Sequence, residues 1–153
     1  MDIIHMLYQY FILFFWSLVA ATFFPVSSEV FLAGMIQQNS KVIILVAVVV
    51  ATIGNVIGGI ITFYMGWKGG DVALKKMSDK NIKRYQKAEK IVNKYGTYSM
   101  ALSWVPFIGD FIVLFGGIFK LPIIPSIIWM TIGKFLRYLV FALSVAGLLD
   151  YFF

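Results

Sequence analysis

Three long apolar blocks make up most of this chain, and their lengths constrain its fold more than any other feature. They run over Ile3–Met35, Val42–Met65 and Tyr98–Phe153, and one polar insert separates the last two. The 24 residues of the middle block would extend about 36 Å as a helix, more than the roughly 30 Å hydrocarbon core of a bilayer. The sequence therefore predicts an all-helical (all-α), polytopic integral membrane protein.

Composition supports a membrane protein and excludes an ordinary soluble domain. Hydrophobic residues make up 61% of the 153 residues and charged residues 13%, whereas soluble domains carry about 25% charged residues. The length fits one membrane domain over residues 1–153. The chain has no cysteine, which excludes disulfides and cysteine-based metal sites.

Positive charge is concentrated in the polar insert. Nine of the 13 Lys and Arg lie within Lys68–Lys94, together with three acids, so the local excess of 9 − 3 = +6 equals the net charge of the whole chain. Basic loops of membrane proteins stay on the cytoplasmic side. We therefore expect residues 67–96 to be cytoplasmic, and the pattern gives no reason to expect a nucleic-acid partner.

The insert is amphipathic, and Gly96 is a plausible helix stop at its end. Lysines occupy most of one face. The apolar residues recur at near-helical spacing, as Leu74, Met77, Ile82, Tyr85, Ala88, Val92 and Tyr95. Such a helix could lie on an anionic membrane surface, and a plain connector packed on the protein explains the pattern equally well.

The middle block carries polar and small residues inside an apolar span. Gly54 and Gly58 are four residues apart, a spacing that indicates close helix packing in membranes. Asn55 is expected to bond to another helix, and it is also a candidate substrate-binding residue.

Two similar interruptions divide the outer blocks. Pro25 precedes Glu29 by four residues, Pro106 precedes Asp110 by four, and about ten apolar residues follow each acid, too few to cross a bilayer. Paired interruptions of this kind indicate re-entrant hairpins in an inverted repeat. The repeats would span 1–66 and 97–153, with 67–96 between them and with Pro25, Pro106 and Gly109 at the re-entrant turns. A chance match of this short pattern is the alternative.

These motifs resemble the DedA family of membrane proteins, also called the SNARE-associated or VTT-domain superfamily. Phe24–Glu29 resembles its proline-containing motif that ends in Glu, and Gly54–Gly58 with Tyr64–Gly70 resembles its glycine-rich helix. Ser103–Asp110 and Gly133–Tyr138 resemble the YqaA-like branch. The resemblance implies a multi-pass protein of the bacterial cytoplasmic (inner) membrane.

The resemblance also implies a function. Members of the family are linked to lipid translocation, including undecaprenyl phosphate recycling and phospholipid movement, often with dependence on the proton-motive force. Most members carry two arginines around the second proline, where this chain has Ser103 and Gly109. Lys134 and Arg137 are the candidates to supply positive charge in their place.

Four charged residues lie in apolar surroundings: Glu29, Asp110, Lys134 and Arg137. Each would cost about 2.5–3.5 kcal/mol at a bilayer centre, so we expect them to pair, to face water or to be protonated. At least one acid and one base should approach within about 4–6 Å. The structural interpretation is ion pairs that lock the two halves together. The functional one is a proton or charge relay through the acids and a headgroup site at the cations.

The interruptions offer further anion-binding groups. Helix N-termini attract phosphates, and Ser27 and Ser28 are candidates to bind a headgroup there. Glu29 and Asp110 would themselves favour these positive helix ends, so helix capping alone is an alternative role for both acids.

The chain carries no recognisable enzyme motif. His5 is the single histidine and no P-loop is present, so no enzyme, metal site or cofactor is indicated. The best hypothesis is a transporter-like protein, of flippase or scramblase type, that moves an anionic lipid or lipid phosphate. Proton coupling and a homo-oligomer stay open. The alternatives are a structural or assembly protein with helix-pairing charges, and a small ion or proton channel.

The basic insert generates a topology prediction. Because residues 67–96 should be cytoplasmic and the chain end after Leu149 external, single cysteines at Lys76 and Phe153 should react with an impermeant thiol reagent from opposite sides of the membrane. The chain has no native cysteine, so the reagent can react only with the introduced one. Labelling of both from the same side would contradict the inverted arrangement.

Overall fold

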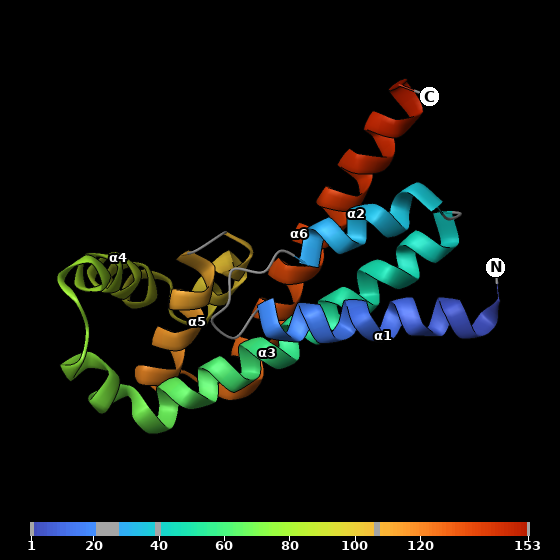
Figure 1. The fold of residues 1–153 in the computed structure, drawn as a ribbon. Coiled ribbons are helices and arrows are strands. Elements are labelled where there is room, and N and C mark those ends of the chain that lie inside the picture. Colours follow the sequence, from blue (N-terminus) through green and yellow to red (C-terminus); the bar gives the residue numbers. More distant parts are fainter. Residues whose placement is uncertain (1, 21–27, 39–40, 106–107, 153) are drawn as a thin grey trace. The chain divides into compact units, whose positions relative to one another are not determined.

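All regular secondary structure in the described part of the chain is helical. A computed structural model describes residues 2–20, 28–38, 41–105 and 108–152, and these ranges contain no strand. The elements are α1 (Ile3–Ala20), α2 (Ser28–Gln38), α3 (Lys41–Lys75), α4 (Asp79–Tyr95), the 3₁₀ helix η1 (Gly96–Trp104), α5 (Ile108–Ile118) and α6 (Ile123–Phe152), drawn in Figure 1. The predicted all-helical fold is confirmed.

Two of the described helices are long and apolar enough, by length and composition, to cross a membrane. The candidate spans are Ile43–Gly70 within α3 and Ile123–Gly147 within α6, and two shorter apolar helices run over Ile3–Val19 and Ile108–Ile118. The sequence analysis ended the middle block at Met65. The helix instead continues to Lys75, so the first basic residues of the insert belong to the same helix as the span.

The chain divides into two compact units. The terminal unit comprises residues 1–58 and 135–153, and the central unit comprises residues 59–134. The terminal unit holds α1 and α2, and the central unit holds α4, η1 and α5. Helices α3 and α6 are each divided between the two units, α3 after Gly58 and α6 after Lys134. The predicted repeats divide the chain at other residues and stay a prediction.

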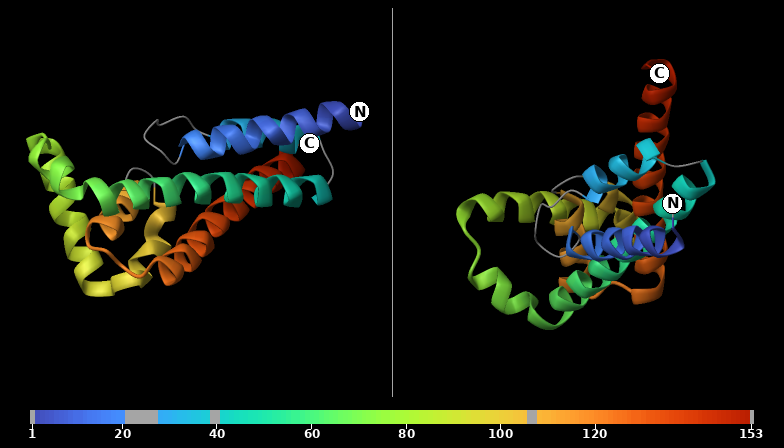
Figure 2. Two further views of the ribbon diagram at one scale, coloured as in Figure 1. Left: turned by 90° about the horizontal axis from the view of Figure 1, so that it is seen from below. Right: turned by 45° about the vertical axis from the view of Figure 1, so that its right-hand side comes forward.

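In the terminal unit, α1 packs against α2 and against the first part of α3. Figure 2 shows α1 running beside this part of α3. A Cβ atom on Gly54 would collide with the main-chain carbonyl of Phe14, so a side chain at this position would push the two helices apart. The close packing predicted for Gly54 is thereby confirmed. The buried core comprises Leu13, Leu32, Met35, Ile36, Ala47, Val48, Ala51, Tyr138 and Ala142.

In the central unit, α5 packs against both α4 and η1. Ala88 and Val92 of α4 are buried, and the Tyr85 ring meets the edge of the Phe115 ring with centroids 4.4 Å apart. The middle of this apolar face is therefore covered by protein, whereas Ile82 and Tyr95 of the same face are 38% and 48% exposed, so a packed connector explains only part of the pattern. Its outer face leaves the basic side chains exposed, namely Lys80, Lys83, Arg84, Lys87, Lys90 and Lys94.

A residue with a positive φ angle follows each of the helices α4 and α5. Helix α4 ends at Gly96, with φ of 57°, whose N–H donates to the Val92 carbonyl, as the sequence predicted. After α5, Lys120 takes φ of 53° while the Leu121 N–H donates to the Gly116 carbonyl at 3.0 Å. This is the bonding of a Schellman cap, with lysine at a position that usually holds glycine.

Helices α3 and α5 meet backbone to backbone. A Cβ on Gly66 would collide with the Leu114 carbonyl, and one on Gly117 would collide with the Phe63 carbonyl. The contact is thus reciprocal and requires glycine on both helices. In a membrane the hydrophobic effect does not drive helices together, because lipid is as apolar as the helices. Membrane helices therefore usually associate through small residues that let their backbones come close.

Two alanine substitutions on α3 test this contact. Gly66→Ala should strongly lower the melting temperature of the purified protein, because the added methyl group meets a main-chain oxygen that cannot rotate away. Gly69→Ala is the matched control, since nothing lies within 4 Å of its Cβ position. It should be neutral or stabilise by about 0.5–1 kcal/mol, as alanine favours the helix. Equal effects of both would contradict the close packing.

Candidate functional site

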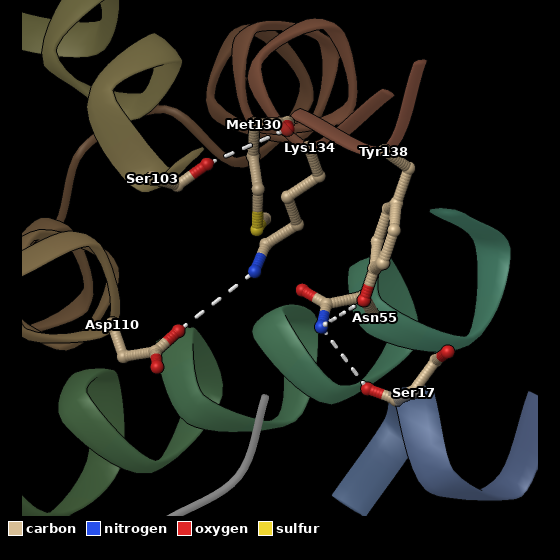
Figure 3. Close-up of polar contacts among 7 residues, drawn as sticks. All are labelled: Ser17, Asn55, Ser103, Asp110, Met130, Lys134 and Tyr138. Carbon is tan, nitrogen blue, oxygen red and sulfur yellow. Dashed lines mark hydrogen bonds and ion pairs between the residues drawn. The ribbon is translucent and has the colours of Figure 1, made fainter. Parts of the chain in front are cut away.

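A buried lysine and a carboxylate form an ion pair in the central unit. Lys134 is residue 12 of the 25 in the Ile123–Gly147 span, and only 2% of its side chain is exposed. Its Nζ lies 3.8 Å from Oδ1 of Asp110, the third residue of α5 (Figure 3). The predicted approach of an acid and a base is confirmed for this pair.

The helix η1 positions both partners of the pair. Gly109, directly before Asp110, packs so closely on the Ser103 carbonyl that a Cβ would collide with it. The Ser103 hydroxyl donates to the Met130 carbonyl at 3.5 Å, one turn before Lys134 (Figure 3). Because η1 contacts α5 beside Asp110 and α6 beside Lys134, it fixes the spacing between the two charges.

The two partners differ sharply in exposure. Lys134 is almost fully buried, whereas 49% of the Asp110 side chain is exposed. Their separation of 3.8 Å is longer than a direct charge-assisted hydrogen bond of about 2.7–2.9 Å. Asp110 also lies in the first turn of α5, where the helix dipole favours a negative charge. The carboxylate is therefore the more accessible partner of the pair.

Asn55 forms a second polar contact, within the terminal unit. Its Nδ2 donates to the main-chain carbonyl of Ser17 on α1 and to the hydroxyl of Tyr138 on α6, each at 3.1 Å (Figure 3). The predicted bonding of Asn55 to other helices is confirmed. Its predicted role in substrate binding stays a prediction.

Sequence reasoning missed Ser17 and Tyr138 as partners of Asn55. Ser17 interrupts the apolar run of α1, which was the available signal. The sequence gave no comparable signal that Tyr138 would bond to Asn55, because a tyrosine in a membrane helix fits a membrane interface or a protein core equally well.

The remaining predicted residues are placed only in part. Arg137 lies half-buried in α6. Ser28 and Glu29 are the first two residues of α2, and their side chains lie outside the described part of the structure. Pro25, Ser27 and Pro106 also lie outside the described residues.

The basic helix α4 contacts the element that carries Asp110. The Arg84 guanidinium lies over the ring of Phe111, 5.7 Å from its centroid, and Phe111 directly follows Asp110 in α5. Burial, and after it the Glu89 carboxylate, raises the pKa of Tyr85, so its hydroxyl stays neutral. The exposed basic side chains of α4 therefore lie on a helix that packs on α5.

Comparison with known proteins identifies a family over most of the chain. The VTT domain model matches residues 24–147. The chain is 35% identical over 141 residues to "Inner membrane protein YqaA" of Escherichia coli, covering 91% of this chain and 93% of that protein, and matches the Shigella flexneri protein of that name equally. An uncharacterized Haemophilus influenzae protein is 28% identical over 133 residues, covering 82% of this chain and 80% of that protein. No solved structure matches. The resemblance found in the sequence is confirmed.

The unequal burial of the ion pair predicts unequal effects of removing each partner. Asp110→Asn leaves the buried Lys134 ammonium without this carboxylate and should lower stability, with the roughly 3–5 kcal/mol of a fully buried pair as an upper limit. Lys134→Met should cost less, about 0–1 kcal/mol, because the half-exposed Asp110 behaves more like a surface ion. Thermal unfolding of both variants in the same detergent checks the order, and the reverse order would contradict the assigned burial.

Proposed function

Because this chain belongs to the VTT-domain family and is a protein of the bacterial inner membrane, we propose that it moves an anionic lipid or lipid phosphate across that membrane. The Asp110–Lys134 pair is the observation that carries the proposal. A cation near the middle of a candidate span is expensive in lipid and is usually retained for function.

In the proposed mechanism the lipid phosphate and the Asp110 carboxylate compete for Lys134. Protonation of Asp110 removes its negative charge, so the ammonium becomes available to the phosphate. Loss of the proton restores the ion pair and releases the phosphate. The half-exposed position of Asp110 supports the protonation step, and contact with the phosphate then requires the buried Lys134 ammonium to become uncovered. Proton coupling then follows from the pair itself.

The start of α5 supplies a second attraction for a phosphate in this proposal. The Gly109 N–H donates to the Val105 carbonyl at 2.9 Å, while the other first main-chain N–H groups have no partners within the helix and carry partial positive charge. Asp110 is the third residue of α5, so a phosphate that displaces it from Lys134 would meet both the ammonium and the helix end. For the first hairpin, Ser27 and Ser28 are proposed as separate headgroup contacts and Glu29 as the acid. Asn55 is also proposed as a contact, but it would have to release Ser17 or Tyr138 to donate to a headgroup.

The re-entrant, inverted-repeat architecture is part of the proposal. Helices α2 and α5 are 11 residues each, about 16 Å long and too short to cross a bilayer. Each has an acid in its first three residues and is followed by a helix of 30 residues or more. These parallels support two equivalent hairpins, with residues 67–96 on the cytoplasmic side.

A structural or assembly role is the second candidate. It is favoured by Asn55, whose amide group joins α1 to α6 through Ser17 and Tyr138, since such bonds hold membrane helices together without any transport. In that case the Asp110–Lys134 pair would also be a structural contact. A small ion or proton channel would need the same charges but would not move lipid.

Reconstitution with labelled lipid tests the transport proposal. Vesicles that contain the protein and a trace of fluorescent phosphatidylglycerol should show translocation that depends on an imposed proton gradient, and fluorescent phosphatidylcholine should move less. Asp110→Asn should abolish the gradient dependence, because asparagine cannot release a proton. Asp79→Asn, which removes an exposed acid from α4, is the matched control and should retain it.

A double variant separates transport from a structural role. Asp110→Asn combined with Lys134→Gln removes both charges, so any stability that Asp110→Asn loses should return. If the pair acts in transport, lipid movement stays lost in this variant although the protein folds. Recovery of both folding and lipid movement would support the structural role and contradict the transport proposal.

A further inference from the structure

One face of α1 buries two polar side-chain oxygen atoms in the terminal unit. Gln9, Leu13 and Ser17 are spaced four residues apart, which aligns them along one side of a helix. Leu13 and Ser17 are fully buried, and so is the Oε1 atom of Gln9. The part of this face around Leu13 and Ser17 therefore lies in the interior of the unit.

The hydroxyl of Ser17 behaves differently from other helical hydroxyls of the chain. A serine or threonine in a membrane helix usually donates to the carbonyl four residues earlier. Four described residues do so at 2.7–2.8 Å, namely Thr52, Ser126, Thr131 and Ser144. Ser17 Oγ has no hydrogen-bond partner among the described residues, and neither has Gln9 Oε1.

The neighbours of Ser17 do not satisfy its hydroxyl. Asn55 donates to the main-chain carbonyl of Ser17, and Figure 3 shows the hydroxyl at the other end of the residue. The α3 backbone is close on this side, since a Cβ on Gly54 would lie 3.1 Å from Ser17 Cβ. A buried polar group without a hydrogen bond is costly, and more so in a membrane where bulk water is absent.

We propose that this face of α1 binds water at Gln9 and at Ser17 and so forms a hydrated seam inside the terminal unit. Gln9 Oε1 can only accept a hydrogen bond, whereas a hydroxyl donates and accepts. An anion would find no donor at Gln9 Oε1, while a water molecule matches both atoms. The carbonyls of α1 each keep a second lone pair that completes the two to four bonds an ordered water requires.

The proposed seam holds water at two separate positions, one at each polar residue. Gln9 and Ser17 are eight residues apart, about 12 Å along the helix, so one molecule cannot serve both. Leu13 lies between them on the same face. The proposal concerns hydration of the terminal unit and does not depend on the lipid transport proposed above.

Hydroxyl-radical footprinting of the protein in lipid nanodiscs tests the seam. Radicals formed from bound water oxidise adjacent side chains, so Leu13 should be oxidised although it is fully buried. Leu32 of α2 is the matched reference, because it is an equally buried leucine of the same core. Leu13 should react several-fold faster than Leu32 in the wild-type protein. In the Gln9→Leu/Ser17→Ala double variant the oxidation rate of Leu13 should fall to that of Leu32.

Thermal stability provides an independent readout. If Ser17 holds water, Ser17→Ala loses those bonds and the melting temperature falls. If the hydroxyl has no partner at all, alanine relieves its burial and the melting temperature rises. A rise, or equal oxidation of Leu13 and Leu32 in the wild-type protein, overturns the proposal. Thr52→Val serves as the control, since its hydroxyl already bonds to the Val48 carbonyl.

Discussion

An ammonium group in the middle of an apolar helix requires a compensating negative charge, and much of the central unit is arranged around that requirement. Lys134 cannot reach bulk water from its buried position, so Asp110 must be held near it. The glycine before Asp110 allows α5 to begin directly against η1, and η1 in turn contacts α6 close to Lys134. Helix α4 then covers the outer side of α5 through Tyr85, Ala88 and Val92.

The features predicted correctly from the sequence are those that a short stretch of chain determines by itself. The lengths of the apolar blocks determine helices, a polar amide in a span must find a partner, and a buried base must lie near an acid. The contacts of Asn55 and Gly54, and the presence of an acid near Lys134, follow from such local necessity. Gly96 ended α4 as expected because few other residues adopt its backbone angles.

The features that escaped prediction depend on contacts between distant segments. The continuation of α3 to Lys75, the long 3₁₀ helix over Gly96–Trp104 and the sharing of α3 and α6 between two units have no local signature. A 3₁₀ run of this length is uncommon, and its burial of Ser99, Met100 and Ser103 shows that packing maintains it. The partner of Lys134 could also have been Glu29 on sequence grounds. The structure places Asp110 beside Lys134, and the side chain of Glu29 lies outside the described residues.

The lengths of the two candidate spans have a consequence for the bilayers that suit this protein. The 28 residues of Ile43–Gly70 and the 25 of Ile123–Gly147 extend about 42 and 37 Å as helices, beyond a hydrocarbon thickness of roughly 30 Å. Helices that exceed the local thickness accommodate the mismatch by tilting. A thicker bilayer would reduce that tilt and still cover the apolar surface, whereas a thinner one would force water onto apolar side chains. The protein should therefore tolerate longer acyl chains better than shorter ones.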